Sequence, residues 1–386
     1  MKKSFSLHTY LIAALVSAVV VGPFLSVATI SGLYTLSSLL KELLEAILPI
    51  MIFFFISSGI TSFKESSVAL LGVIFASVFV SNTIASITSY GVCQALLPFF
   101  RESAHCALPN KASITPLYSL HLPKLILAEQ ALFAALVVGV VLSLIRYRPL
   151  LKFLADGRAS IEWCLNNMFI PLLPLYILGF FLKILHELPF AQLCSVYGTV
   201  FVVIIIVQLL YLAAFYGISY SSRAYDAFMT AVPSYLTAMG TMSSVAALPV
   251  SLESARKNTG NRALSDVCMP IFANIHLTGD AISVPIFCLV TMQLFLHSSP
   301  LFSEYLIFVG YFCVSMLAVS GIPGGGILVM IPILQSLLGF TDEMVSVMTA
   351  LYLLQDSFGT AANVMGDGAL VNIINTAGKK LSLIKS

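Results

Sequence analysis

Residues Ser320-Gly321-Ile322-Pro323-Gly324-Gly325-Gly326 lie in the middle of an apolar stretch that is too long for a turn and too broken for one helix. Farther back along the chain, Ser243-Ser244-Val245-Ala246-Ala247-Leu248-Pro249 interrupts an apolar stretch in the same way. Each interruption is followed by an apolar helix that carries acidic residues. The chain from about residue 225 onward therefore contains two units of one plan, a broken hairpin and then a polar-studded helix.

The composition restricts the class of protein that such a plan can belong to. Of the 386 residues, 59% are hydrophobic and only 9% are charged, against about 25% charged in a typical soluble domain. A soluble enzyme or a disordered chain needs more charge, and a net charge of +2 offers no basic patch for nucleic acid. Continuous apolar runs, rather than alternating ones, predict a helical multi-pass membrane protein and not a β-barrel.

The apolar runs predict six spans before residue 225. The first, at about 7–30, is too long for the apolar core of a signal peptide, and the others lie at about 43–62, 68–97, 113–145, 160–185 and 194–220. If both termini are cytoplasmic and the rest of the chain forms two hairpins and two spans, most Lys and Arg residues fall on the cytoplasmic side. We therefore expect an integral, multi-pass protein of the cell inner membrane.

Seven cysteines are scattered through the sequence without any CxxC pair. Most lie inside apolar segments, so we interpret them as small hydrophobic residues rather than as a disulfide framework or a metal site.

The last apolar helix carries the strongest polar pattern. Asp356, Thr360, Asn363 and Asp367 recur at offsets of 4, 7 and 11 residues, which places them within about 60° of one helix face. An acidic side chain at bilayer depth is costly, and it is normally paired or lines an ion pathway. Exposure at a solvated helix end is the alternative for Asp367, but it does not explain Asp356.

A second polar group lies within residues 271–285. Asn274, His276, Thr278 and Asp280 are spaced by two, with Gly279 and Pro285 nearby. This spacing scatters them around a regular helix, so we expect an unwound stretch whose free carbonyls coordinate a cation such as Na⁺. His276 could carry a proton instead, or be a neutral, hydrogen-bonded histidine.

Two further sets of polar residues complete the candidate site. Ser81 and Asn82, inside the third span, supply more Na⁺ ligands or merely join helices. At the hairpin tips, half-helix N-termini and the hydroxyls of Ser243 and Ser244 suit a substrate carboxylate. The glycines of the second tip allow close backbone approach and a flexible gate.

These motifs resemble the dicarboxylate/amino acid:cation symporter family, which has the glutamate-transporter fold. The Gly-x-Pro-Gly tip of that family matches Gly321-Ile322-Pro323-Gly324, and its Asn-x-x-Gly-Asp motif matches Asn363 to Asp367. Its Leu-Pro-Val motif after the first tip matches residues 248–250. The resemblance covers about residues 225–380 well, whereas the N-terminal half agrees mainly in its number of spans.

The resemblance implies an all-α fold with eight transmembrane helices and two re-entrant helical hairpins in inverted repeats. It also implies a homotrimer in which a transport domain moves like an elevator against a scaffold. The scaffold would be residues 1–66 (helices 1–2) and 101–190 (helices 4–5), and the transport domain residues 67–100 (helix 3) and 191–386. Within the last segment, helix 6 would precede hairpin 1 (about 225–262), helix 7 (about 263–297), hairpin 2 (about 303–340) and helix 8 (about 341–378).

The resemblance also implies roles for individual residues. Asp356 would hold the substrate amine, while Asn363 and Ser244 would face the substrate carboxylate with Thr360 nearby. Asp367 and the Asn363 carbonyl would ligate Na⁺. The second hairpin, with its tip at residues 321–324, would be the outer gate.

Four positions depart from the family pattern. Gly359 and Met242 stand where the family has arginines, so the side chain of a glutamate would be desolvated without a partner. We therefore favour a neutral or small polar amino acid as substrate over an acidic amino acid or a dicarboxylate. Thr278 and Tyr352 stand where the family has acidic residues. Transport would therefore be coupled to Na⁺ through fewer Na⁺ sites than in the family, or to H⁺ through His276.

The hypothesis is therefore a secondary active symporter rather than an enzyme. An intramembrane aspartyl protease would use Asp280 and Asp367, each preceded by Gly, but its usual motif has a further Gly where this chain has Leu277 and Val364. An ion channel would not need two occluding hairpins.

Overall fold

The structure is a computed structural model that describes residues 7–61, 68–104, 114–120, 122, 126, 128–164, 167–168, 170–187, 190–318 and 325–380. Its elements are helices, and the described residues contain no strand. The protein is thus all-helical, as predicted. The N-terminal helices are α1 (Leu7–Val21), α2 (Val27–Thr61), α3 (Val68–Ala104), α4 (Ala128–Ile145), α5 (Arg148–Cys164) and α6 (Ile170–Glu187).

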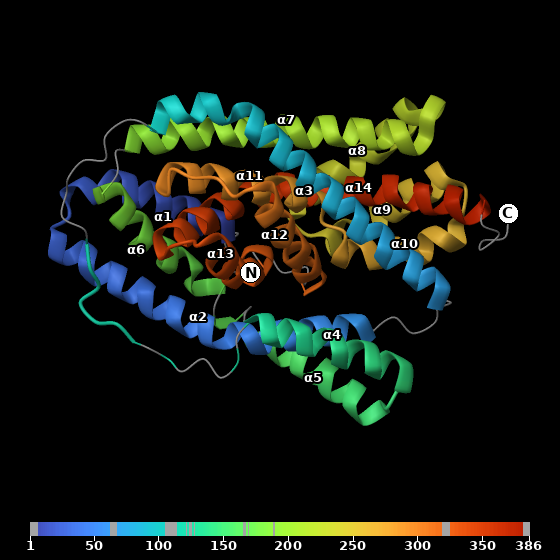
Figure 1. The fold of residues 1–386 in the computed structure, drawn as a ribbon, viewed down its shortest axis with the longest axis horizontal. Helices are drawn as coiled ribbons and strands as arrows, with labels where there is room; N and C mark the ends of the chain where they lie inside the picture. Colours follow the sequence, from blue (N-terminus) through green and yellow to red (C-terminus); the bar gives the residue numbers. More distant parts are fainter. Residues whose placement is uncertain are drawn as a thin grey trace, which may run out of the picture.

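The C-terminal half begins with the long helix α7 (Phe190–Tyr220), which is followed by three helix pairs and a last helix. The pairs are α8 (Ala224–Thr241) with α9 (Ser244–Thr259), α10 (Arg262–Ile275) with α11 (Thr278–Phe295), and α12 (Phe302–Ser315) with α13 (Gly325–Leu338). The last helix is α14 (Asp342–Lys380). In Figure 1, α11 and α14 lie in the middle of the molecule, with α7 and α8 on one side and α2, α4 and α5 on the other.

Four predicted spans in the N-terminal half have wrong boundaries. The predicted span 7–30 is divided, because a 3₁₀ turn at Gly22–Phe24 with Pro23 near its start separates α1 from α2. Helix α2 therefore begins at Val27, well before the predicted 43. Its Ser and Thr hydroxyls bond back to its own carbonyls, as Thr35 does to Ser31 at 2.6 Å, so these polar residues are compatible with a long helix.

The other two errors also lie where proline is present. Residues 114–120, which include Pro116, are not helical, so α4 begins only at Ala128 rather than at 113. This segment docks on α2 instead, where Ser31 Oγ donates to the Thr115 carbonyl at 2.7 Å. The predicted span 160–185 is also divided, since α5 ends at Cys164 and α6 begins at Ile170 with Pro171 in its first turn.

Three described helical stretches are long and apolar enough to cross a membrane, namely Gly72–Leu96, Tyr197–Thr241 and Arg262–Phe295. The most apolar 18-residue window of the last stretch is completely buried inside the protein, and so the polar residues of that window face other helices rather than lipid. Such placement is typical of intramembrane polar residues with a function.

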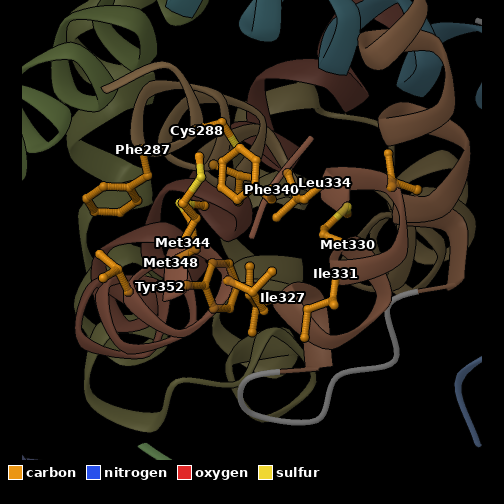
Figure 2. Packing of buried hydrophobic residues seen from close by; sticks show 14 of the residues in the cluster. Phe287, Cys288, Ile327, Met330, Ile331, Leu334, Phe340, Met344, Met348 and Tyr352 are labelled. Atoms are coloured by element: carbon orange, nitrogen blue, oxygen red, sulfur yellow. The ribbon is translucent and has the colours of Figure 1, made fainter. Parts of the chain in front are cut away.

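One apolar cluster joins α11, α13 and α14 (Figure 2). It includes Phe287 and Cys288 of α11, Ile327 and Met330 of α13, and Tyr352 of α14. Close packing of such side chains has crystal-like density, so the contact holds these helices at a defined separation. The cluster therefore fixes the start of α13 against α14, next to the polar residues described below.

A buried ion pair joins the two halves of the chain. Lys183 of α6 bonds to Glu343 in the first turn of α14. The Lys183 ammonium also lies 4.6 Å from the ring centroid of Tyr34 in α2, and it is 4% exposed. Burial of an ammonium requires such partners, because isolated charges are strongly disfavoured in an apolar interior.

Candidate substrate and cation site

The predicted interruption between residues 271 and 285 is present, and it is short. Helix α10 ends at Ile275 and α11 begins at Thr278, so only His276, which is extended, and Leu277 lie between the two helices. Gly279 and Pro285 lie inside α11 rather than in an unwound stretch. The Asn82 amide of α3 donates to the Ile275 carbonyl at 3.4 Å, which satisfies one backbone oxygen at the break.

The His276 side chain is the centre of a buried polar network. Its Nδ1 lies 2.8 Å from Asp367 Oδ1, and its Nε2 lies 2.9 Å from Ser81 Oγ and 2.8 Å from Thr278 Oγ1. Phe215 and Phe272 flank the ring, which is fully buried. A neutral imidazole that donates from Nδ1 to Asp367 can accept hydroxyl protons at Nε2, whereas an imidazolium donates on both sides.

The first turn of α11 is capped by a side chain from α14. Asn363 Oδ1 accepts from the backbone N–H of Gly279 at 2.6 Å and of Asp280 at 3.3 Å. Asn363 Nδ2 donates to Asp280 Oδ2 at 3.1 Å. From α7, Gln208 Nε2 donates to the Gly279 carbonyl at 3.0 Å. The Asn363 side-chain amide is thus engaged in orienting α11.

Two glycines allow α11 and α14 to approach closely at this point. A Cβ on Gly279 would lie 2.9 Å from the Ala362 Cβ and closer still to the Gly359 carbonyl oxygen. A Cβ on Gly366 would lie 3.0 Å from Thr278 Oγ1. Side chains at these positions would separate the helices, so the polar network depends on their absence.

Two carboxylates, those of Asp356 and Asp280, lie near this crossing of α11 and α14. Thr360 Oγ1 donates to Asp356 Oδ1 at 3.1 Å, and both residues are buried, at 7% and 5% exposure. Asp280 is 5% exposed, and the groups that act on it electrostatically are Asp356, Asn363 and Tyr352. None of these groups is cationic, which agrees with the missing arginines at positions 359 and 242.

The first helix pair turns at the predicted serines. Met242 adopts a left-handed conformation with a φ of 52°, and Ser243 caps α9 by accepting from the Ala246 N–H at 3.2 Å. The Ser243 hydroxyl oxygen is therefore already engaged in capping α9. Ser244 lies in the first turn of α9 and is 8% exposed. Behind it, Ala247 packs on Ala361 and Val364 of α14, which brings the tip beside Thr360 and Asn363.

The tip of the second pair, with Gly321, Ile322, Pro323 and Gly324, lies outside the described residues. Its C-terminal arm begins at Gly325, and Gly326 lies against the Tyr352 hydroxyl. Since Tyr352 also adjoins Asp280, this arm borders the same polar site. Gly325 and Gly326 are both inside α13.

Comparison with known proteins agrees with this arrangement. The sequence profile of the sodium:dicarboxylate symporter family matches residues 7–377. The chain belongs to the sodium:dicarboxylate symporter family. This assignment favours transport over the intramembrane protease and the channel, and it makes the protein a non-enzymatic symporter. In the structure, Asp280 and Asp367 bond to different partners, Asn363 and His276.

Curated relatives in this family match part of the chain. The serine/threonine transporter SstT of Acinetobacter baylyi is 29% identical over 148 residues, which cover 37% of each chain. The SstT of Acinetobacter baumannii is 33% identical over 137 residues, or 34% of each chain, and that of Enterococcus faecalis is 29% identical over 155 residues, or 39% of this chain and 36% of its own. The matches thus span little more than a third of these relatives' length.

The symporter's polar residues do not all meet in one place. Asn274 donates to the Pro270 carbonyl of its own helix at 2.9 Å and takes no part in the network. Gln208 and Gln355, in contrast, lie in the site although no sequence pattern indicated them. Gln355 is adjacent to Asp356 but off the polar stripe, and Gln208 is a lone polar residue in an apolar helix, so neither carries a periodic signal.

Proposed function

We propose that the protein is a secondary active symporter that carries a small neutral or polar amino acid with Na⁺. The observation that carries this proposal is a buried polar site, with Asp280, Asp356, Thr360 and Asn363, formed by α11 and α14 inside an apolar bundle. Acidic residues at such depth mark substrate and ion pathways.

The substrate class follows from the charges around this site. Asp356, held by Thr360, suits the ammonium of an amino acid, and Ser244 at the start of α9 suits its carboxylate. Gly359 and Met242 provide no cation for an acidic side chain, which would then be desolvated without a partner. The names of the SstT relatives, which transport serine and threonine, support the same class.

The coupling ion follows from the oxygen ligands near the helix break. Asp367 supplies a carboxylate, and the Asn363 carbonyl and the carbonyls at residues 274–277 supply neutral oxygens, as hard cations prefer. The family's name also supports Na⁺. A proton carried by His276 is the alternative, because the imidazole bonds directly to Asp367.

The proposed architecture has eight transmembrane helices and two re-entrant hairpins in inverted repeats. The hairpins are α8 with α9 and α12 with α13, and the broken seventh helix is α10 with α11. We further propose a homotrimer in the cell inner membrane, with both termini cytoplasmic, in which residues 67–100 and 191–386 move against a scaffold of residues 1–66 and 101–190. Cross-linking of the purified protein in lipid would test the trimer.

The decisive experiment measures uptake into proteoliposomes for a panel of amino acids and dicarboxylates, with Na⁺ and pH gradients imposed separately. We expect uptake of serine, threonine or alanine driven by a Na⁺ gradient. Uptake driven by a pH gradient alone, and abolished by His276→Gln, would overturn Na⁺ coupling in favour of the proton. Ion flux without any amino acid uptake would overturn the symporter.

A further inference from the structure

Three hydroxyl groups of α7 donate hydrogen bonds to the backbone of α14 in the turn that carries Asp367. In order along α7, the bonds are Tyr216 Oη to the Met365 carbonyl at 3.0 Å, Ser219 Oγ to the Ala369 carbonyl at 2.8 Å and Tyr220 Oη to the Gly368 carbonyl at 2.8 Å. This part of α14 lies beside α7 (Figure 1). A helical carbonyl already accepts from the N–H four residues on, so each of these oxygens uses its second lone pair for α7.

The residues that supply these carbonyls lie on the opposite side of α14 from Asp367. At about 100° per residue, positions 365, 368 and 369 fall within roughly 100° of one another, and position 367 falls roughly 150° from their centre. On its own side, Asp367 Oδ1 lies 2.8 Å from His276 Nδ1. One turn of α14 is therefore held from both sides, by α7 on one and by the break before α11 on the other.

The two glycines that flank Asp367 permit both of these contacts. A Cβ on Gly368 would lie 2.7 Å from the Tyr216 hydroxyl oxygen, and a Cβ on Gly366 would lie 3.0 Å from Thr278 Oγ1. A side chain at either position would therefore push the neighbouring helix away. Glycine inside a helix also leaves the backbone freer than alanine does, so the Gly-Asp-Gly turn gains a fixed position from the contacts outside it.

The two tyrosines are themselves held in place by packing. Tyr216 and Tyr220 are buried, and their rings stack with centroids 5.5 Å apart. Phe228 of α8 packs edge-on against Tyr216, with centroids 5.5 Å apart. A tyrosine whose ring is fixed in this way delivers its hydroxyl to one point. The α7 donors are thus a rigid support for α14 at Asp367.

We propose that Tyr216, Ser219 and Tyr220 are positioning residues for Asp367 as a ligand of the coupling Na⁺. They act through the α14 backbone, setting the rotation and height of the turn that carries the carboxylate, and they do not bind the ion. Groups that orient a metal ligand strongly affect how tightly the metal is bound. The inference rests on the proposed Na⁺ coupling, which it deepens by naming what holds the ligand in place.

The test removes one hydroxyl and keeps the ring, in Tyr216→Phe. Na⁺ binding is measured as the thermal shift of the purified protein across a Na⁺ titration, with choline holding the ionic strength constant. The Na⁺ dependence of serine uptake into proteoliposomes is measured in parallel. We expect the Na⁺ concentration at half-maximal effect to rise by about three- to tenfold in both assays. The uptake rate at saturating Na⁺ should stay within about twofold of the wild type, since only binding of the ion is weakened.

Tyr197→Phe is the matched control on the same helix. Tyr197 is also buried, and its hydroxyl bonds to Thr291 Oγ1 of α11 at 3.1 Å. It lies about 28 Å along α7 from Tyr216, far from Asp367. A loss of hydroxyl bonding that affects only stability should lower the melting temperature of both variants. We expect the control to keep the wild-type Na⁺ dependence.

Two results would overturn the positioning role alone. One is a wild-type Na⁺ dependence in Tyr216→Phe, whatever its melting temperature, and the other is an equal rise in the Tyr197→Phe control. If Tyr216→Phe does not fold, Tyr220→Phe, which removes the bond to the Gly368 carbonyl, provides the same comparison with the same expected rise. Absence of any Na⁺ effect on the wild-type protein in both assays would overturn Na⁺ coupling itself, and the positioning role with it.

Discussion

The crossing of α11 over α14 can be tested at Gly279, where Ala adds a single methyl group. That methyl would lie 2.9 Å from the Ala362 Cβ and closer to the Gly359 carbonyl, whereas carbon atoms prefer a separation of about 3.5–4.0 Å. Overpacking of this kind costs about 1–3 kcal/mol. Separation of the helices would also weaken the two bonds from Asn363 to the α11 backbone, at about 1 kcal/mol each.

Helix propensity offsets part of this cost. Ala is about 1 kcal/mol more favourable than Gly in a helix interior, and the gain is smaller in the first turn, where Gly279 lies. The net expectation is a loss of about 2–4 kcal/mol. With an unfolding entropy of about 2.1 cal/mol/K per residue, this loss lowers the melting temperature of the 386-residue chain by about 2–5 °C.

The assay is thermal unfolding of the purified protein in detergent, followed by uptake into proteoliposomes. Gly198→Ala in α7 is the matched control, because a Cβ there would meet nothing within 4 Å. We expect the control to be as stable as the wild type or slightly more so. If Gly279→Ala melts with the control and transports normally, the close approach of α11 and α14 is wrong.

Three other perturbations address the site and its surroundings. Asp356→Ala removes the proposed amine ligand, and we expect loss of uptake with an unchanged elution volume on size exclusion; retained uptake would remove Asp356 from substrate binding. Gly359→Arg alone would place its guanidinium beside the Asp280 carboxylate, which would pair with it. We therefore expect improved uptake of acidic amino acids only when Gly359→Arg is combined with Asp280→Ser. No gain in the double variant would contradict the interpretation of position 359. Lys183→Met leaves Glu343 partly buried without its partner, which lowers the stability by up to about 3 kcal/mol. In thermal unfolding, we expect the double variant with Glu343→Gln to recover part of this stability. Additive losses in the two single variants and the double variant would show that the pair is not coupled.

The local features of the fold could be predicted from the sequence. The helix break at His276, the turn at Ser243 and the polar stripe of α14 each depend on residues close together in the chain. Prolines, caps and a 3.6-residue period are visible in a single sequence. The predicted spans 113–145 and 160–185 have wrong boundaries because apolar character alone does not distinguish a helix from a non-helical apolar segment that packs against a helix.

The contacts between distant segments could not be predicted in the same way. The engagement of Asn363 with Gly279 joins residues 84 positions apart, and the network of His276 with Ser81 joins residues 195 apart. Gln355 lies beside Asp356 in sequence, yet it faces Asp280 rather than the polar stripe. Such pairings depend on how helices cross, which a single sequence does not encode locally.

The length of α14 has a consequence for how substrate gains access. Its 39 residues extend about 58 Å, whereas the hydrocarbon core of a bilayer is about 30 Å thick. Asp356 and Asp367 lie about 21 Å and 38 Å from the start of the helix, so the polar site is near its midpoint and remote from both ends. Neither aqueous compartment can reach this depth by fraying of a helix end, so a substrate bound there as proposed would have to enter from the side, between α14 and the helix pairs that cover it.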